Sequence, residues 1–117
     1  MNVAQPLVQA GLLGEAIDAG PALVFVADDD MRYVAVNQTA CEALGSEREE
    51  LLELRVTDVA RYEEAPQEFA EMVAAGEASG RATVVRKDGS ELEIEYRASR
   101  VTVAQMTFYV SIALVVD

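Results

Sequence analysis

Residues 22–45 read ALVFVADDDMRYVAVNQTACEALG, and this stretch decides the fold. Its first apolar run, Leu23–Ala27, predicts a strand, the three aspartates Asp28–Asp30 predict a turn, and Arg32–Val36 predicts a second strand. Asn37 then begins a helix, because its side-chain oxygen can accept hydrogen bonds from free backbone amides. The glycine that closes the stretch is a natural C-terminal stop for that helix. The stretch therefore predicts strand, turn, strand and capped helix.

Helices are predicted on both sides of this stretch. Residues 5–19 form an amphipathic helix with apolar side chains at near-helical spacing, ended by Gly20-Pro21. Ser46 and Glu49 make a capping box that predicts a further short helix, and one more turn is expected at residues 57–60. A longer helix is expected over residues 65–75, ended by Gly76, with an inner face formed by Phe69, Met72 and Val73.

Three strands are predicted in the last third of the chain, at residues 81–86, 91–101 and 105–116. Lys87-Asp88-Gly89 forms a hairpin turn between the first two, with glycine supplying a positive φ. The second of these strands alternates strictly between apolar and polar side chains. Turns of hairpin length make the three strands antiparallel neighbours. The element order predicts an α+β domain with helices packed on a single sheet.

Composition excludes several classes of function. The 117 residues fit one domain, and no apolar run approaches the ~20 residues of a membrane span. The net charge of −12 disfavours binding to nucleic acid and direct contact with an anionic membrane. Cys41 is the only cysteine, so no internal disulfide can form, and a small buried hydrophobe is favoured over a reactive thiol. We expect a cytoplasmic protein.

Three segments in this order resemble a PAS domain. The stretch quoted above resembles the family's opening, VVRKDGSELEIEYRASRV (residues 84–101) its central hairpin, and VSIALVVD (residues 110–117) its last strand. The resemblance covers residues 21–117 and leaves residues 1–20 as an N-terminal amphipathic cap helix. It implies the PAS fold: a five-stranded antiparallel sheet curved around a small cavity, with short helices on one face and an N-terminal capping helix.

The resemblance also implies a function in signal transduction rather than an enzyme. PAS domains sense ligands, light or redox state, or pair with partners, and pass the result to an output domain such as a kinase or a transcription regulator. We expect such a downstream domain in the parent protein, in a two-component system or a transcription factor. The alternative is a ligand-free module for dimerisation and interaction. No catalytic constellation supports an enzyme.

The residues argue against the usual cofactors of the family. The chain contains no histidine, which PAS haem usually needs as its ligand. In light-sensing members, amide side chains from the last three strands hold a flavin, and the resemblance places these positions on Val84, Ile94 and Val115, which are apolar. Cys41 lies outside the reactive-cysteine motif. We expect neither haem nor flavin.

The same correspondence assigns a cavity face to the sheet. Its residues are Leu23, Phe25, Ala27, Val84, Leu92, Ile94, Tyr96, Ser111, Ala113 and Val115. One interpretation is a pocket for a small apolar ligand oriented by Tyr96 and Ser111, and the other is a collapsed core without a ligand. No metal site is expected, because the acidic residues Asp28–Asp30, Glu63 and Glu64 lack the spacing of a calcium loop.

Alternation in the last strand places apolar residues on the opposite face as well. This face and the first helix carry the interface candidates Val8, Leu12, Leu13, Ile17, Val110, Ile112, Leu114 and Val116. We expect the helix to cover this face, either from the same chain or exchanged from a partner in a homodimer. A monomer sealed by its own helix is the open alternative.

The acidic surface predicts salt-dependent stability. Its composition, with one lysine among nine basic residues, resembles that of proteins from salt-loving archaea, although high genomic GC content gives a similar bias. At a charge of −12, self-repulsion eases as the screening length shortens to ~3 Å near 1 M salt. We expect the Tm in circular-dichroism melts to rise from low salt to molar KCl. A flat Tm would contradict the interpretation as a halophile protein.

Overall fold

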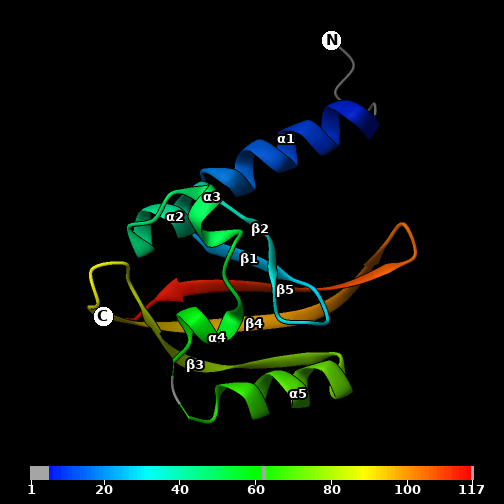
Figure 1. Cartoon of the computed structure of the whole chain (residues 1–117). Helices are drawn as coiled ribbons and strands as arrows, with labels where there is room; N and C mark the ends of the chain where they lie inside the picture. Colours follow the sequence, from blue (N-terminus) through cyan, green and yellow to red (C-terminus); the bar gives the residue numbers. More distant parts are fainter. Residues whose placement is uncertain (1–5, 62, 117) are drawn as a thin grey trace.

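A five-stranded antiparallel sheet with the order β2-β1-β5-β4-β3 forms the centre of the molecule (Figure 1). The structure is a computed structural model and describes residues 6–61 and 63–116. The strands are β1 (Leu23–Ala27), β2 (Tyr33–Val36), β3 (Glu77–Val85), β4 (Glu91–Val103) and β5 (Met106–Val115). The last strand of the chain, β5, therefore lies in the middle of the sheet. This arrangement confirms the predicted fold class.

Within residues 6–61 and 63–116, five helices accompany the sheet. They are α1 (Pro6–Asp18), α2 (Gln38–Leu44), α3 (Arg48–Leu51), α4 (Val56–Val59) and α5 (Ala65–Ala75). The helices α2 to α5 lie on one face, whereas α1 extends from α2 and α3 away from the rest of the molecule (Figure 1). No residue of α1 is buried. Among the described residues, no helix has the length and apolar character needed to cross a membrane.

Several predicted boundaries differ from the structure. The N-cap of α3 is Glu47 rather than Ser46, because the Ser46 N–H is already bonded to the Cys41 carbonyl at the end of α2. Strand β3 begins at Glu77, directly after the glycine that ends α5, since the long β4 offers it nine paired positions. The pairing of β4 with β5 reaches Val103, beyond the predicted end of the strand.

Residues 101–108 form a two-stranded ribbon that projects beyond the rest of the sheet. The pairing of β5 with β1 ends at Tyr109, and that of β4 with β3 ends at Ser99, so the ribbon strands pair only with each other. Its turn, Ala104-Gln105, has φ values of 51° and 65°. Two successive left-handed residues are typical of the tight hairpin turns whose twist matches that of the strands.

Asn37 joins β1, α1 and α2 through a buried amide. Its Oδ1 accepts hydrogen bonds from the N–H of Val24 (2.9 Å) and of Ala40 (3.0 Å). Its Nδ2 donates to the carbonyls of Ile17 and Ala22, both at 2.8 Å. The amide thus caps α2, as predicted, and also fixes the start of β1 and the end of α1. All four of its hydrogen-bonding positions are used within the protein.

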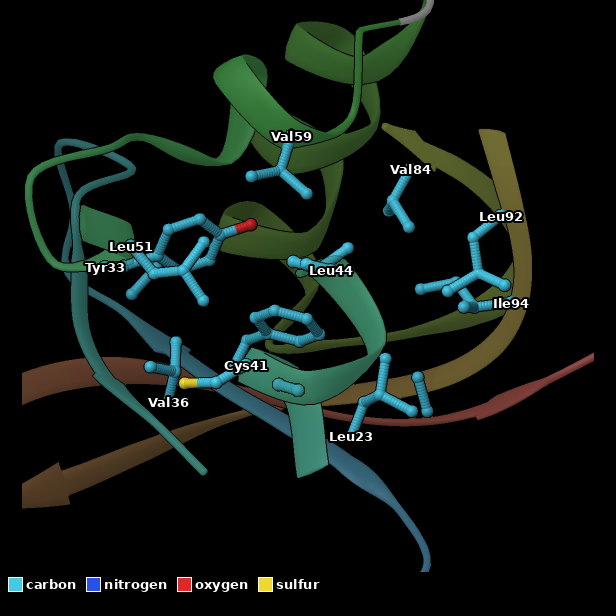
Figure 2. Packing of buried hydrophobic residues seen from close by; sticks show 14 residues of the cluster. Leu23, Tyr33, Val36, Cys41, Leu44, Leu51, Val59, Val84, Leu92 and Ile94 are labelled. Carbon is cyan, nitrogen blue, oxygen red and sulfur yellow. The ribbon is translucent and has the colours of Figure 1, made fainter. Parts of the chain in front are cut away.

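The main core lies between the inner face of the sheet and α2, α3 and α4 (Figure 2). Leu23 of β1, Leu44 of α2 and Leu51 of α3 are its largest fully buried side chains. A smaller cluster beside it contains Met72 of α5 and Tyr109 of β5. The buried cysteine Cys41 belongs to the main core, which agrees with the interpretation as a small hydrophobe.

Removal of the Asn37 amide should destabilise the whole domain. We expect Asn37→Ala to lower the free energy of unfolding by about 3 kcal/mol, because four hydrogen bonds are lost and buried backbone groups lose their partner. Gln38→Ala is the matched control, since this exposed side chain bonds only to Glu42 and should matter by less than about 0.5 kcal/mol. Urea unfolding followed by circular dichroism measures both. Equal losses in the two variants would contradict the assigned role.

Candidate functional site

A cavity of about 110 Å³ lies between the inner face of the sheet and the helices α4 and α5. All five strands contribute to it. The lining residues are Phe25, Ala27, Tyr33, Val56, Ala60, Ala65, Glu68, Phe69, Met72, Ala78, Ala82, Val84, Ile94, Tyr96, Ala98, Tyr109 and Ser111. Most of these side chains are apolar, so the cavity has the character of a site for a small molecule rather than for an ion.

Six of the ten predicted cavity residues lie in this lining: Phe25, Ala27, Val84, Ile94, Tyr96 and Ser111. Leu23, Leu92 and Ala113 are buried in the core beside the cavity without lining it. Val115 pairs with Ile94 and so lies on the predicted face, but it is not among the lining residues. Its side chain is 45 % exposed, because β1 pairs with β5 only as far as Ala113 and leaves the end of β5 uncovered.

Most of the lining residues absent from the prediction follow the same periodicities. Ala82, Ala98 and Tyr109 lie two positions from predicted cavity residues on β3, β4 and β5, so simple extension of the alternation finds them. Phe69 and Met72 were already assigned to the inner face of α5, and this face forms one wall of the cavity. Tyr33 is different, because alternation gives the wrong face for it.

A bulge in β2 turns Tyr33 toward the inside. Phe25 pairs with Val36 and Val26 with Ala35, but Ala27 pairs with Tyr33, so Val34 has no partner on β1. Strict alternation from the buried Val36 would place Val34 inside and Tyr33 outside. The extra residue reverses this order, as β-bulges do. Tyr33 is consequently buried, whereas Val34 is 43 % exposed.

The Tyr33 ring is packed on all sides. Its centroid lies 5.5 Å from that of Phe25, and it is 7 % exposed. Figure 2 shows the hydroxyl pointing inward toward Val59 of α4. That hydroxyl forms no hydrogen bond with any residue that the structure describes. Burial raises the pKa of Tyr33 far above its ordinary value, and the negative charge of Asp58 raises it further, so the phenol is neutral.

Two other tyrosines line the cavity with different surroundings. The Tyr109 hydroxyl donates to the Asp29 carboxylate at 2.9 Å, and the ring meets Phe69 edge-on with centroids 5.6 Å apart. Burial and this hydrogen bond raise the pKa of Tyr109. Burial, followed by the charge of Glu68, raises the pKa of Tyr96. Among the described residues that line the cavity, Glu68 is the only charged one.

The acidic turn serves the fold. The Asp28 carboxylate accepts hydrogen bonds from the N–H of Asp30 (2.9 Å) and of Arg32 (3.0 Å), which shapes the turn between β1 and β2. Within the described parts of the chain, no three acidic or cysteine side chains come close enough to share a metal ion. Burial raises the pKa of Cys41, and the neighbouring Arg48 opposes this effect.

The outer face of the sheet carries an apolar stripe that is partly to largely exposed among the described residues. The outer stripe consists of Met106, Phe108, Val110, Ile112, Leu114 and Val116, all on alternate positions of the last strand or its continuation. Ile112 and Leu114 are 51 % and 55 % exposed. Of the two expected ways of covering this face, the one by the chain's own helix is not found, because α1 extends away from the sheet (Figure 1).

The four interface candidates on α1 are also accessible. Leu12, Leu13 and Ile17 are each at least half exposed, and Val8 is partly buried. The end of the helix is fixed to the domain: the Arg48 guanidinium donates to the Asp18 carboxylate at 2.7 Å, and the Gln38 N–H donates to the same oxygen. Coverage of these residues by a partner chain remains a prediction.

Comparisons with known proteins agree with this architecture. A family model described as a PAS domain matches residues 21–117. No curated protein matches the chain. Many solved structures are similar, and one is a PAS domain from a two-component sensor histidine kinase, with a TM-score of 0.83 and 15% identity, covering 96% of this chain and 100% of that chain.

Two further structures are similar over nearly their whole length. A domain of a sensory box sensor histidine kinase/response regulator from Geobacter sulfurreducens has a TM-score of 0.80 and 21% identity, covering 97% of this chain and 99% of that chain. The PAS domain of an HTR-like protein from Haloarcula marismortui has a TM-score of 0.78 and 19% identity, covering 92% of each chain. At these identities the similarity shows the fold.

Proposed function

Because the chain belongs to the PAS domain family, we propose that it is a sensory module that detects a small molecule in the cavity and passes the signal to an output domain of the parent protein. The observation that carries the proposal is the cavity itself, since all five strands and two helices supply its walls. A ligand there contacts every strand of the sheet. Binding can therefore shift the equilibrium between two arrangements of the sheet and its helices.

Strand β5 provides a route from the cavity to the surface. Ser111 faces the cavity, and its neighbour Ile112 lies in the outer stripe. Two residues earlier in the strand, Tyr109 likewise faces the cavity and its neighbour Val110 lies in the outer stripe. Movement of β5 on binding changes both faces at once, because the two sets of side chains share one backbone. A kinase is the favoured output, in view of the sensor kinases named among the similar structures, and a transcription regulator is the alternative.

The same cavity supports a sensor without haem or flavin. Its volume of about 110 Å³ is below the range of about 300–1,000 Å³ found for drug-sized ligands, and a flavin is at least of that size. Val84 and Ile94 line it without a polar group that could hydrogen-bond to a flavin ring. The chain has no histidine to hold a haem iron. We infer that the module is not catalytic, because the lining offers no nucleophile paired with a base.

Extraction of the purified protein tests the proposal. We expect a colourless protein that releases a small molecule on denaturation, detected by mass spectrometry. Ala98→Leu, which fills the cavity from β4, should abolish this release. Ser99→Leu is the matched control, because it places the same side chain at the next position, which is exposed.

Two results would count against this function. A flavin or Soret band in fresh protein would exclude the cofactor-free sensor. An empty wild-type protein, with no stabilisation by any small molecule from a broad library, would favour the ligand-free module instead.

A ligand-free dimerisation module is the second candidate. The observation that favours it is the exposure of two apolar surfaces in one chain, the outer stripe and the α1 residues Leu12, Leu13 and Ile17. Exposed apolar patches of this kind usually mark contact sites. Because α1 projects away from its own sheet, its apolar side chains are available to the outer stripe of a second copy, which gives a symmetric homodimer.

The dimer is tested by a charge on the outer stripe. We expect wild-type protein to be dimeric in light scattering, and Ile112→Glu to be monomeric with its secondary structure retained, because burial of a carboxylate in an apolar interface is costly even with Arg97 opposite it on β4. Ser79→Glu is the control, since Ser79 is exposed and lies on β3, two strands away from the stripe. Ser79 pairs with Arg97, which in turn pairs with Ile112, so all three are on the same face of the sheet. A wild-type monomer at high concentration, in low and high salt alike, would exclude the dimer.

A further inference from the structure

We propose that the ligand of the cavity is a small organic amine, with its apolar part inside the cavity and its ammonium group beside Glu68. This inference rests on the proposed function, because it requires that the cavity receives a small molecule. It goes further by naming the chemical class of the ligand, the side on which its charged end lies and the residue that selects it.

The cavity adjoins a polar groove at the free edge of the sheet. The groove has a volume of about 220 Å³ and lies at β3, the outermost strand on that side. Its residues are Glu68, Arg81, Ala82, Thr83 and Glu93, and two of them, Glu68 and Ala82, also line the cavity. Arg81 and Glu93 are exposed, so the groove is open to solvent. A ligand that extends from the cavity past Glu68 therefore has one end in apolar surroundings and the other in polar ones.

The cavity itself accommodates the apolar end. An engineered cavity of about 150 Å³ lined by aliphatic and aromatic side chains binds benzene, so one of about 110 Å³ takes an apolar group of roughly four to six carbon atoms. The walls include Phe69 and Met72 of α5, and Val84 and Ile94 of the sheet. Each carbon that leaves water for these walls contributes to binding through the hydrophobic effect.

The charge between the cavity and the groove favours a cation at the other end. Among the described residues that line either space, the acidic ones are Glu68 and Glu93 and the single basic one is Arg81. Two carboxylates exceed one guanidinium, so the junction carries a negative net charge. The charge of −12 on the whole chain adds to it and raises the local concentration of cations. An anionic ligand is repelled there for the same reason.

Glu68 can bind an ammonium group in addition to its contacts within the protein. A carboxylate has about four positions that accept hydrogen bonds, and it keeps its charge when some of them are used. Burial raises the pKa of Tyr96, and the nearby charge of Glu68 raises it further, so this charge acts on the space that Tyr96 lines. A charge that disfavours a phenolate there stabilises an ammonium ion. The ring faces of Tyr96 and Phe69 attract a cation as well.

The test uses three probes that share one carbon skeleton: isoamylamine, isoamyl alcohol and isovalerate. Methylammonium is the fourth probe, an amine without the apolar part. Chemical-shift titrations in NMR spectra of wild-type protein give the Kd of each. We expect isoamylamine to bind at least about fivefold more tightly than isoamyl alcohol, which lacks the charge, and isovalerate to bind most weakly of the three. Methylammonium should bind at least about tenfold more weakly than isoamylamine, because it buries almost no apolar surface.

A matched pair of variants on α5 tests the role of Glu68. Glu68→Gln and Glu71→Gln remove the same charge from the same helix, but Glu71 is exposed and lies outside both linings. We expect Glu68→Gln to weaken isoamylamine by about threefold to tenfold and to leave isoamyl alcohol within about twofold, because only the charged contact is lost. Glu71→Gln should change neither by more than about twofold. Equal weakening of isoamylamine in both variants would overturn the role of Glu68, since it reports a general attraction to the acidic surface.

Two measurements on wild-type protein do not depend on any variant. The preference for isoamylamine over isoamyl alcohol should decrease from low salt to molar KCl, because the screening length shortens to ~3 Å near 1 M. A preference that salt leaves unchanged would contradict selection by charge. In the complex with isoamylamine, nuclear Overhauser contacts should connect the isoamyl methyl protons with the rings of Phe69 and Tyr96. Their absence in a complex that does form would overturn the placement in the cavity.

The remaining outcomes separate this inference from the function beneath it. If isoamyl alcohol or isovalerate binds as tightly as isoamylamine, the amine class is wrong while the cavity remains a ligand site. If methylammonium binds as tightly, the apolar cavity contributes nothing and the proposed placement is wrong. If no probe binds but denatured wild-type protein releases a molecule that is not an amine, this inference alone fails. If no probe binds and extraction yields nothing, both the inference and the proposed function fail.

Discussion

The buried amide of Asn37 is the interaction on which the rest of the structure depends. It holds the end of α1, the start of β1 and the first turn of α2 through four hydrogen bonds. Because α2 packs on β1, and β1 pairs with β2 and β5, a shift of this amide would move one wall of the cavity. The salt bridge between Asp18 and Arg48 adds a second link to the same end of α1. These contacts fix the position at which α1 joins the domain, while the remainder of the helix projects from it (Figure 1).

The bulge in β2 decides which residues of that strand reach the inside of the domain. One unpaired residue, Val34, is enough to bring the Tyr33 ring inside. An unfilled space in the core lowers the stability of a domain, because the side chains that line it lose packing contacts. The bulge places an aromatic ring where it both belongs to the main core and lines the cavity.

Local signals in the sequence predicted most of the fold. Asn37, Gly45 and Gly76 each begin or end a helix as expected, because capping depends on a few neighbouring residues. The alternation of β4 likewise placed Ile94 and Tyr96 on the cavity side, since the period of a strand is a local property.

The errors arose where distant segments decide the outcome. The inward position of Tyr33 depends on the pairing of β2 with β1, and the exposure of Val115 depends on where β1 ends beside β5. The direction of α1 depends on the contacts of Asp18 with Arg48. None of these is encoded in the pattern of the segment itself. The cavity face could therefore be predicted on the long strands, but the inward position of Tyr33 and the exposed end of β5 could not.

The ribbon of residues 101–108 determines where the length of this protein can change. In β5 successive residues serve opposite faces, so one residue added between Tyr109 and Ala113 would exchange the cavity wall with the outer stripe. The turn at Ala104-Gln105 lies beyond both neighbouring strands, and residues added there would leave every pairing of β5 in place. Natural variation in length is accordingly expected to accumulate at this tip. For the same reason the tip is a suitable position for inserting a fluorescent reporter, which would follow motion of the central strand without touching either of its faces.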